Sequence, residues 1–219
     1  MAHAISNAVR LYAVIPAEEG RTFRMRGVAF LRCGTISAVV GCAPPFENNA
    51  SAGLWHDRVV GRALRTCSAV VPFRLGVDLG SQAEIVHLLS LNEVELSAAL
   101  GRFRGCVEMG LKIRIGPGLD ASANDGFLRL PPRVDGVRAL APHSADRREW
   151  LSRAPRGTTF DGCYLILRRA IAQFWRAVDD IRQADPEVPL LGSGPWAPYS
   201  FCDVPLRNRA PEGRAQVTQ

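Results

Sequence analysis

The sequence predicts an α+β protein, because patterns typical of strands alternate with patterns typical of amphipathic helices along its 219 residues. The clearest strand covers residues 107–115, where five apolar residues alternate with polar ones: Val107, Met109, Leu111, Ile113 and Ile115. A period of two puts these apolar side chains on one face of a half-exposed antiparallel strand. The clearest helical pattern covers residues 161–184, where apolar positions from Tyr164 to Ile181 are three and four residues apart.

The first half of the chain adds four further strands, predicted from short apolar runs at 11–15, 27–33, 35–40 and 70–76. Gly34 lies between the second and third runs and favours a hairpin there. Pro72 lacks a backbone donor, so the fourth strand is expected at a sheet edge or at a bulge.

Two helices are predicted in the same half. One covers residues 52–67 with Ser51 as its N-cap, because apolar residues recur there at every fourth position. The other begins with the capping-box pattern that runs from Ser81 to Glu84 and ends near residue 101. Residues 90–93 interrupt its apolar stripe, so a kink is expected there.

The second half is harder to interpret. Residues 117–157 are rich in Pro and Gly and are expected to be partly ordered, with a brief strand at 127–130 and a brief helix at 145–152. Residues 192–201 are expected to form a tight turn and a nearly extended final strand that completes a core. We expect the polar residues 206–219 to form a disordered tail.

Composition limits the classes of function. A chain of this length forms one large domain or two small ones, and 47% hydrophobic with 22% charged residues is typical of a globular protein. The formal net charge of +6 allows an acidic protein, nucleic acid or an anionic membrane surface as partner. The arginines are scattered, however, which favours solvated faces over a nucleic-acid footprint.

The cysteines indicate a reducing compartment. The six form no Cys-x-x-Cys pair and lie among apolar residues, so they are expected to be small core side chains: Cys33, Cys42, Cys67, Cys106, Cys163 and Cys202. Neither a secretion signal nor about 18 uninterrupted apolar residues is seen. We therefore expect a cytoplasmic protein that spans no membrane.

No catalytic, metal or cofactor site is predicted. None of the four histidines is spaced to share a metal with another His or Cys, and His56 and His87 are expected at helix surfaces or boundaries. Gly192-Ser193-Gly194 opens no helix, so it does not match a phosphate-binding turn. Cys163 is expected in the core rather than as a nucleophile. An RNA-binding sheet and an enzyme of unknown reaction remain as alternative hypotheses.

Several landmarks occur together in an order that carries a family resemblance. They are Leu11–Ala17, His56–Val60, Val71–Gly76 (Val-Pro-Phe-Arg-Leu-Gly), Gly105–Lys112, Tyr164-Leu165 and Gly194–Phe201 (Gly-Pro-Trp-Ala-Pro-Tyr-Ser-Phe). In this order the chain resembles the gas vesicle protein GvpL/GvpF family over residues 11 to about 203. It departs from the family pattern at Ala197, where Pro is usual, and at Leu75, where Phe is commoner.

The resemblance implies two small α+β domains, each an antiparallel or mixed sheet packed with helices. The first would cover residues 1–104, and the second, ferredoxin-like, residues 105–205 with the insert 117–157. It also implies a non-enzymatic accessory protein of gas vesicle formation that binds the hydrophobic shell protein and other accessory proteins, with no small-molecule substrate and no nucleic acid.

The family motif supplies the residues with a possible role in partner binding: Pro72, Arg74, Gly76, Gly194, Pro195, Trp196, Pro198, Tyr199 and Phe201. We expect Trp196 and Tyr199 in the core, with a partner surface as the alternative. Arg74 is expected in an internal ion pair, with Glu108 as a candidate partner.

Overall fold

The sheet of the N-terminal half is built on β1 (Val9–Pro16), in which every side chain from Leu11 to Ile15 is at most 1% exposed. This is the burial that a continuous apolar run predicts. The computed structural model describes residues 8–42, 50–115, 122–124, 127–129, 144–154 and 157–207. The chain divides into two units, one of residues 1–67, 73–102 and 203–219 and the other of residues 68–72 and 103–202.

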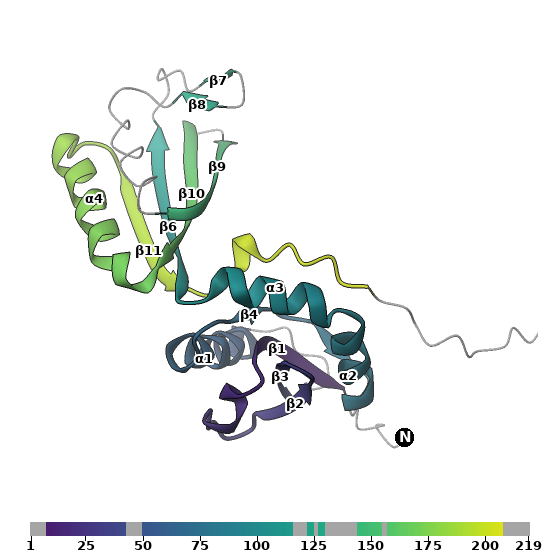
Figure 1. Cartoon of the computed structure of the whole chain (residues 1–219). Helices are drawn as coiled ribbons and strands as arrows, with labels where there is room; N and C mark the ends of the chain where they lie inside the picture. The colour runs from purple at the N-terminus through teal and green to yellow at the C-terminus, as the bar shows by residue number, and fades with distance from the viewer. Residues whose placement is uncertain are drawn as a thin grey trace, which may run out of the picture. The chain divides into compact units, whose positions relative to one another are not determined.

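The N-terminal sheet has the strand order β2-β3-β1-β4, and β5 also pairs with β1 (Figure 1). The further strands are β2 (Ala29–Cys33), β3 (Ile36–Cys42), β4 (Val71–Pro72) and β5 (Asp78–Leu79), and a 3-10 turn, η1, covers Glu19–Arg21. The hairpin of β2 and β3 turns at Gly34, whose φ of 52° is in the left-handed region that glycine tolerates. Pro72 lies in the edge strand β4, as predicted, but the expected strand stops there instead of reaching residue 76.

Three helices accompany this sheet: α1 (Ala50–Thr66), α2 (Gln82–Leu91) and α3 (Glu93–Phe103). Ser51 lies inside α1 and is not its N-cap, which corrects the prediction. Ser81 does cap α2, because its Oγ accepts a hydrogen bond from the Glu84 backbone N–H at 3.2 Å. The predicted kink is confirmed, since the fully buried Asn92 separates α2 from α3.

The C-terminal unit contains a four-stranded antiparallel sheet of order β11-β6-β10-β9. The strands are β6 (Cys106–Ile115), β9 (Ser144–Ala154), β10 (Gly157–Leu167) and β11 (Leu190–Trp196), with the short pair β7 (Ser122–Asn124) and β8 (Phe127–Arg129) between β6 and β9. Numbered along the chain, the four strands have the order 4-1-3-2, which is that of a ferredoxin-like sheet. The expected ferredoxin-like arrangement is therefore confirmed.

One face of this sheet is covered by α4 (Ile171–Ala184), which follows the 3-10 turn η3 (Arg168–Ala170) (Figure 1). The ring of Phe174 lies 5.8 Å from that of Tyr164 in β10, measured between centroids. Trp175 packs on Gly192 of β11, where an added Cβ would meet the indole at 2.5 Å. These contacts identify the face that also carries Met109, Leu111 and Ile113 of β6.

Two helix predictions in this half are wrong. Residues 157–167 form β10 rather than the first turns of the predicted helix, because Phe160, Tyr164 and Ile166 are buried with a period of two against β6. Their spacing to Ile171 matches a helical period only across the junction of strand and helix. Residues 145–152 lie within β9, where pairing with β10 determines the conformation.

Two further expectations fall largely outside the described residues. Of the insert 117–157, the structure describes only 122–124, 127–129, 144–154 and 157; of the tail 206–219, it describes residues 206 and 207. The division of the chain at 104–105 stays a prediction.

Candidate functional site

The motif that closes the chain begins in β11 and continues into the 3-10 turn η4 (Tyr199–Phe201). The nearly extended course expected for it therefore stops at Trp196. Gly194 has a φ of 114°, and a Cβ there would meet the Glu108 carbonyl oxygen at 2.8 Å, so only glycine fits without strain. Gly194 therefore determines where the motif turns back over the sheet.

Trp196 is 47% exposed, so the prediction that it lies in the core is wrong. The register pairs Trp196 with Glu108, and directly opposite residues of an antiparallel pair leave the sheet on the same side. That side is the one opposite α4. Phe201 and Pro198 are buried and Tyr199 is half-buried. The motif therefore has two parts: residues 198–201, which we call the anchor, and the exposed indole of Trp196.

Glu108 is the group that holds the anchor in place. Its carboxylate is buried and accepts two hydrogen bonds from Ser200, at 2.8 Å from the backbone N–H and 2.7 Å from the hydroxyl. A buried carboxylate needs such donors to offset its lost hydration. The expected ion pair with Arg74 is not found, because Glu108 bonds to Ser200 and Arg74 is exposed.

Arg148 of β9 completes the anchor from the other edge of the sheet. Its guanidinium carbon lies 5.6 Å from the centre of the Phe201 ring, within the range of a cation–π contact. Ser200 also lies 3.4 Å from the Cys163 sulfur. Strands β6, β9 and β10 therefore all contribute side chains beneath η4.

Cys163 is not activated as a nucleophile. Burial raises the pKa of its thiol, which keeps it protonated at neutral pH. The neighbouring Glu108 carboxylate accepts both of its hydrogen bonds to Ser200, from the backbone N–H and from the hydroxyl. None of the six cysteines, all of which the structure describes, forms a disulfide; Cys67 and Cys106 are buried as expected, whereas Cys42 is exposed, which corrects the prediction for that residue.

The face of the sheet opposite α4, which we call the open face, carries the rest of the site. The register places four cross-strand rows on it: Trp196, Glu108, Leu165 and Asp146; Ser193, Gly110, Cys163 and Arg148; Leu191, Lys112, Asp161 and Trp150; and Arg114, Thr159 and Ser152. The anchor contacts the first two rows. In the third row Leu191 is 64% and Trp150 43% exposed.

Three of the exposed large hydrophobic side chains of the described residues therefore lie on the open face, namely Trp150, Leu191 and Trp196. Between the first two, the Lys112 ammonium pairs with the Asp161 carboxylate at 3.0 Å. The alternation of β6 predicted one charged face, but Glu108 on that face is buried beneath η4. Sequence reasoning missed Trp150, because residues 145–152 were assigned to a helix.

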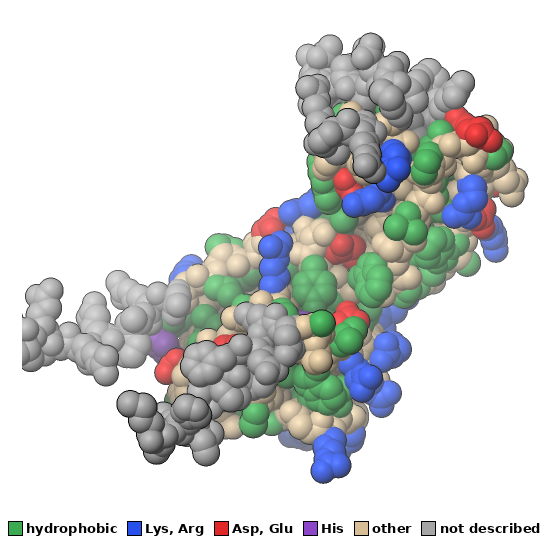
Figure 2. Space-filling view, turned by 180° about the vertical axis from the view of Figure 1, so that it is seen from behind, with side chains coloured by type: hydrophobic (Ala, Val, Ile, Leu, Met, Phe, Trp, Pro, Cys, Tyr) green, Lys and Arg blue, Asp and Glu red, His purple; other side chains and the backbone are tan. Residues whose placement is uncertain are grey.

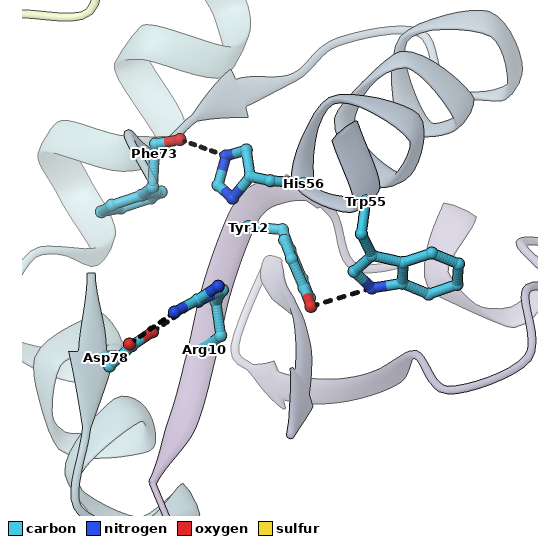
Figure 3. A network of polar contacts seen from close by, with 6 residues as sticks. All are labelled: Arg10, Tyr12, Trp55, His56, Phe73 and Asp78. Atoms are coloured by element: carbon cyan, nitrogen blue, oxygen red, sulfur yellow. Dashed lines mark hydrogen bonds and ion pairs between the residues drawn. The ribbon is translucent and has the colours of Figure 1, made fainter. Parts of the chain in front are cut away.

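The N-terminal unit contains a second polar cluster, drawn in Figure 3. Arg10 is 2% exposed and donates two hydrogen bonds to the Asp78 carboxylate, at 2.7 and 2.8 Å. These bonds raise the pKa of Arg10 and keep it charged. The Trp55 indole N–H donates to the Tyr12 hydroxyl at 3.1 Å.

His56 lies in the same cluster and is buried, contrary to the prediction of a surface or boundary position. Its Nε2 donates to the Phe73 carbonyl oxygen at 2.8 Å, whereas Nδ1 has no hydrogen-bond partner within the described part of the chain. Burial lowers the pKa of His56, so the ring is neutral at pH 7. The cluster stabilises the packing of α1 on β1 and includes no titrating pair suited to catalysis.

Of the other predicted site residues, Pro72 is buried in β4, and Gly76 has a φ of 94° in the turn that leads to β5. The described residues include no group of three His, Cys, Asp or Glu side chains that could hold a metal ion. Among those same residues no helix is long and apolar enough to cross a membrane.

The two sheets define the class: the chain is a two-unit α+β protein whose C-terminal sheet is ferredoxin-like and leaves part of one face open. The model of the family "Gas vesicle synthesis protein GvpL/GvpF" matches residues 8–125 and 129–203. The chain belongs to this family, and the resemblance inferred from its sequence is confirmed.

Curated relatives agree with this assignment, and two solved structures share the fold. The chain is 26% identical to gas vesicle protein L of Streptomyces sp. (strain CB03234), over 80% of this chain and 82% of that protein. It is 24% identical to gas vesicle protein F2 of Halobacterium salinarum, over 88% and 91%. The crystal structure of GvpF from Anabaena sp. PCC7120 has a TM-score of 0.75 at 16% identity, covering 93% of this chain and 99% of that one. The crystal structure of GvpF from Microcystis aeruginosa has a TM-score of 0.70 at 14% identity, covering 90% of this chain and 99% of that one.

Proposed function

We propose that this accessory protein of gas vesicle formation binds the hydrophobic shell protein and other gas vesicle accessory proteins. It acts in a chaperone-like or nucleating way, in the cytoplasm and at the gas vesicle, and catalyses no reaction. Family membership supports a role in gas vesicle formation, and the exposed apolar side chains of the open face support binding of the hydrophobic shell protein.

The observation that carries the proposal is the exposure of Trp150, Leu191 and Trp196 on one face of one sheet. A shell subunit exposes apolar surface before it assembles, and such surface aggregates. A protein that shields it must offer apolar side chains and still remain dispersed in water. Figure 2 shows that hydrophobic side chains are interspersed with charged ones on the face of the molecule that it draws, and a mixed surface of this kind keeps a protein dispersed in water.

Within the family motif we assign different roles to the C-terminal residues. Trp196 contacts the partner, while Pro198, Tyr199 and Phe201 hold the turn that presents it. Gly194 and Pro195 set the course of the chain into that turn. A contribution of Pro72, Arg74 and Gly76 to partner binding stays a prediction; the exposure of Arg74 is compatible with it.

RNA binding is the second candidate, because a four-stranded sheet of this type can stack bases on exposed aromatic side chains. Here both exposed aromatic residues of the open face lie on the outer strands, Trp150 on β9 and Trp196 on β11. The two central strands place the Lys112–Asp161 ion pair and Gly110 where bases would stack. A protein partner fits this surface better.

Co-purification tests the proposal. The tagged protein is expressed with the shell protein, and Leu191→Ser is compared with Leu54→Ser, which changes an equally exposed leucine of α1 in the N-terminal unit. We expect the parent and Leu54→Ser to retain the shell protein and Leu191→Ser to lose most of it. Failure of the parent to retain any gas vesicle protein, with normal vesicles in a deletion strain, would contradict the proposal.

A further inference from the structure

A pocket with walls of two different kinds opens on the C-terminal sheet. It has a volume of about 370 Å³ and is lined by residues of β6, β10 and the β11 edge: Lys112, Arg114, Thr159, Pro189, Leu190 and Leu191. Lys112 and Arg114 are two residues apart on β6 and point to the open face. Pro189 and Leu191 form the apolar wall beside them.

The cations of this pocket are incompletely neutralised. Lys112 shares one carboxylate, that of Asp161, and its side chain remains 60% exposed. Arg114 is exposed, and its guanidinium has no ion-pair or hydrogen-bond partner among the residues that the structure describes. Among the described residues, Lys112 pairs with one carboxylate and the Arg114 guanidinium with none, so the pocket has room for another anion.

The apolar wall adds a second kind of contact beside the two cations. Leu191 and Pro189 are exposed, and the Pro189 carbonyl oxygen accepts the Arg114 backbone N–H at 3.0 Å, which fixes the wall beside that cation. An occupant that satisfies both walls must combine a carboxylate with an aliphatic side chain. Neighbouring residues of a polypeptide provide this combination.

We propose that the pocket takes an acidic, aliphatic segment of a partner protein, with a Glu or Asp carboxylate between Lys112 and Arg114 and a neighbouring Leu, Ile or Val side chain against Leu191 and Pro189. The inference rests on the proposed function and adds to it the chemistry of the contact. Charge complementarity at the two cations selects an acidic segment, and the aliphatic wall makes the contact resistant to salt in part.

The test uses a fluorescein-labelled peptide of alternating Glu and Leu, a counterpart with Gln in place of Glu, and a uridine decamer, each titrated with the full chain by fluorescence anisotropy. Arg114→Glu is compared with Arg176→Glu. The control makes the same charge change at an exposed residue of α4, which lies on the other face of the sheet. We expect the Glu peptide to bind the parent and Arg176→Glu alike and to bind Arg114→Glu about tenfold more weakly. Leu191→Ser should weaken binding of the Glu peptide at every salt concentration, because the contact that it removes is apolar.

Three results would overturn the inference. They are equal affinity for the Glu and Gln peptides, equal losses of affinity for the Glu peptide in Arg114→Glu and Arg176→Glu, and tighter binding of the uridine decamer than of the Glu peptide.

Co-purification separates this inference from the proposed function. If the parent and Arg114→Glu retain the shell protein equally, the function stands and the pocket assignment fails. If neither retains a gas vesicle protein, the function fails and the peptide titrations decide the pocket alone.

Discussion

Replacing Glu108 with Ala should release the turn that presents Trp196. The change removes the acceptor of two hydrogen bonds from Ser200, at 2.8 and 2.7 Å. Hydrogen bonds to a charged group contribute about 1.5–3 kcal/mol each, and half-buried Ser200 regains some of this from water, so the free energy of unfolding should fall by about 2–4 kcal/mol. For a chain of this size that corresponds to a drop in melting temperature of roughly 4–16 °C.

A double-mutant cycle checks this reasoning by urea unfolding of the parent, Glu108→Ala, Ser200→Ala and the double variant. Because the two residues bond directly, we expect a coupling free energy of at least about 1 kcal/mol. Glu108→Gln keeps one acceptor oxygen and should cost less than Glu108→Ala. Additive single effects, or an unchanged melting temperature for Glu108→Ala, would refute the assignment of Glu108 as the group that holds the anchor in place.

Three further predictions concern stability. Asp78→Ala leaves the Arg10 guanidinium buried without its carboxylate and should cost about 2–4 kcal/mol by urea unfolding; Asp78→Asn, which keeps an acceptor, should cost less. Burial lowers the pKa of His56 in the folded state, so the unfolded state binds more protons below about pH 6.5; stability should therefore fall as the pH drops below that value, and His56→Gln should flatten the dependence in pH-resolved melting. Gly194→Ala forces a side chain at a φ of 114° and should cost about 1–3 kcal/mol, whereas a melting curve equal to the parent's would show that the turn is not as constrained as described.

Exposure also changes the expectation for Trp196 itself. A fully buried indole would cost about 3–5 kcal/mol when truncated to Ala. Because Trp196 is 47% exposed, only about half of its apolar surface is buried, so Trp196→Ala should cost about 1.5–2.5 kcal/mol while it reduces partner retention. If Trp196→Ala costs the full 3–5 kcal/mol expected for a buried indole and still retains the partner, Trp196 is a core residue and not a contact residue.

Local patterns predicted much of the fold. The period of two located β6, the capping box located α2, and the interruption at 90–93 located the break at Asn92. Pro72 lies at a sheet edge, which is one of the two positions that its missing backbone donor predicts. Each of these features depends on residues close together in the sequence, so one sequence suffices to find them.

The errors arose where distant residues determine the outcome. β9 and β10 are strands because they pair with each other and with β6, and a helical spacing across the β10–α4 junction concealed this. His56 is buried because Phe73, seventeen residues later, supplies an acceptor. Trp196 lies on the open face because it pairs with Glu108, a register that no local pattern reveals.

Hydrogen exchange measured by mass spectrometry, on the full chain with and without the shell protein, tests the central claim most directly. We expect slower exchange in residues 106–115 and 190–196, which form the open face at β6 and β11, and no change in α1, residues 50–66. Protection confined to the N-terminal unit, or none anywhere in the chain, would contradict it.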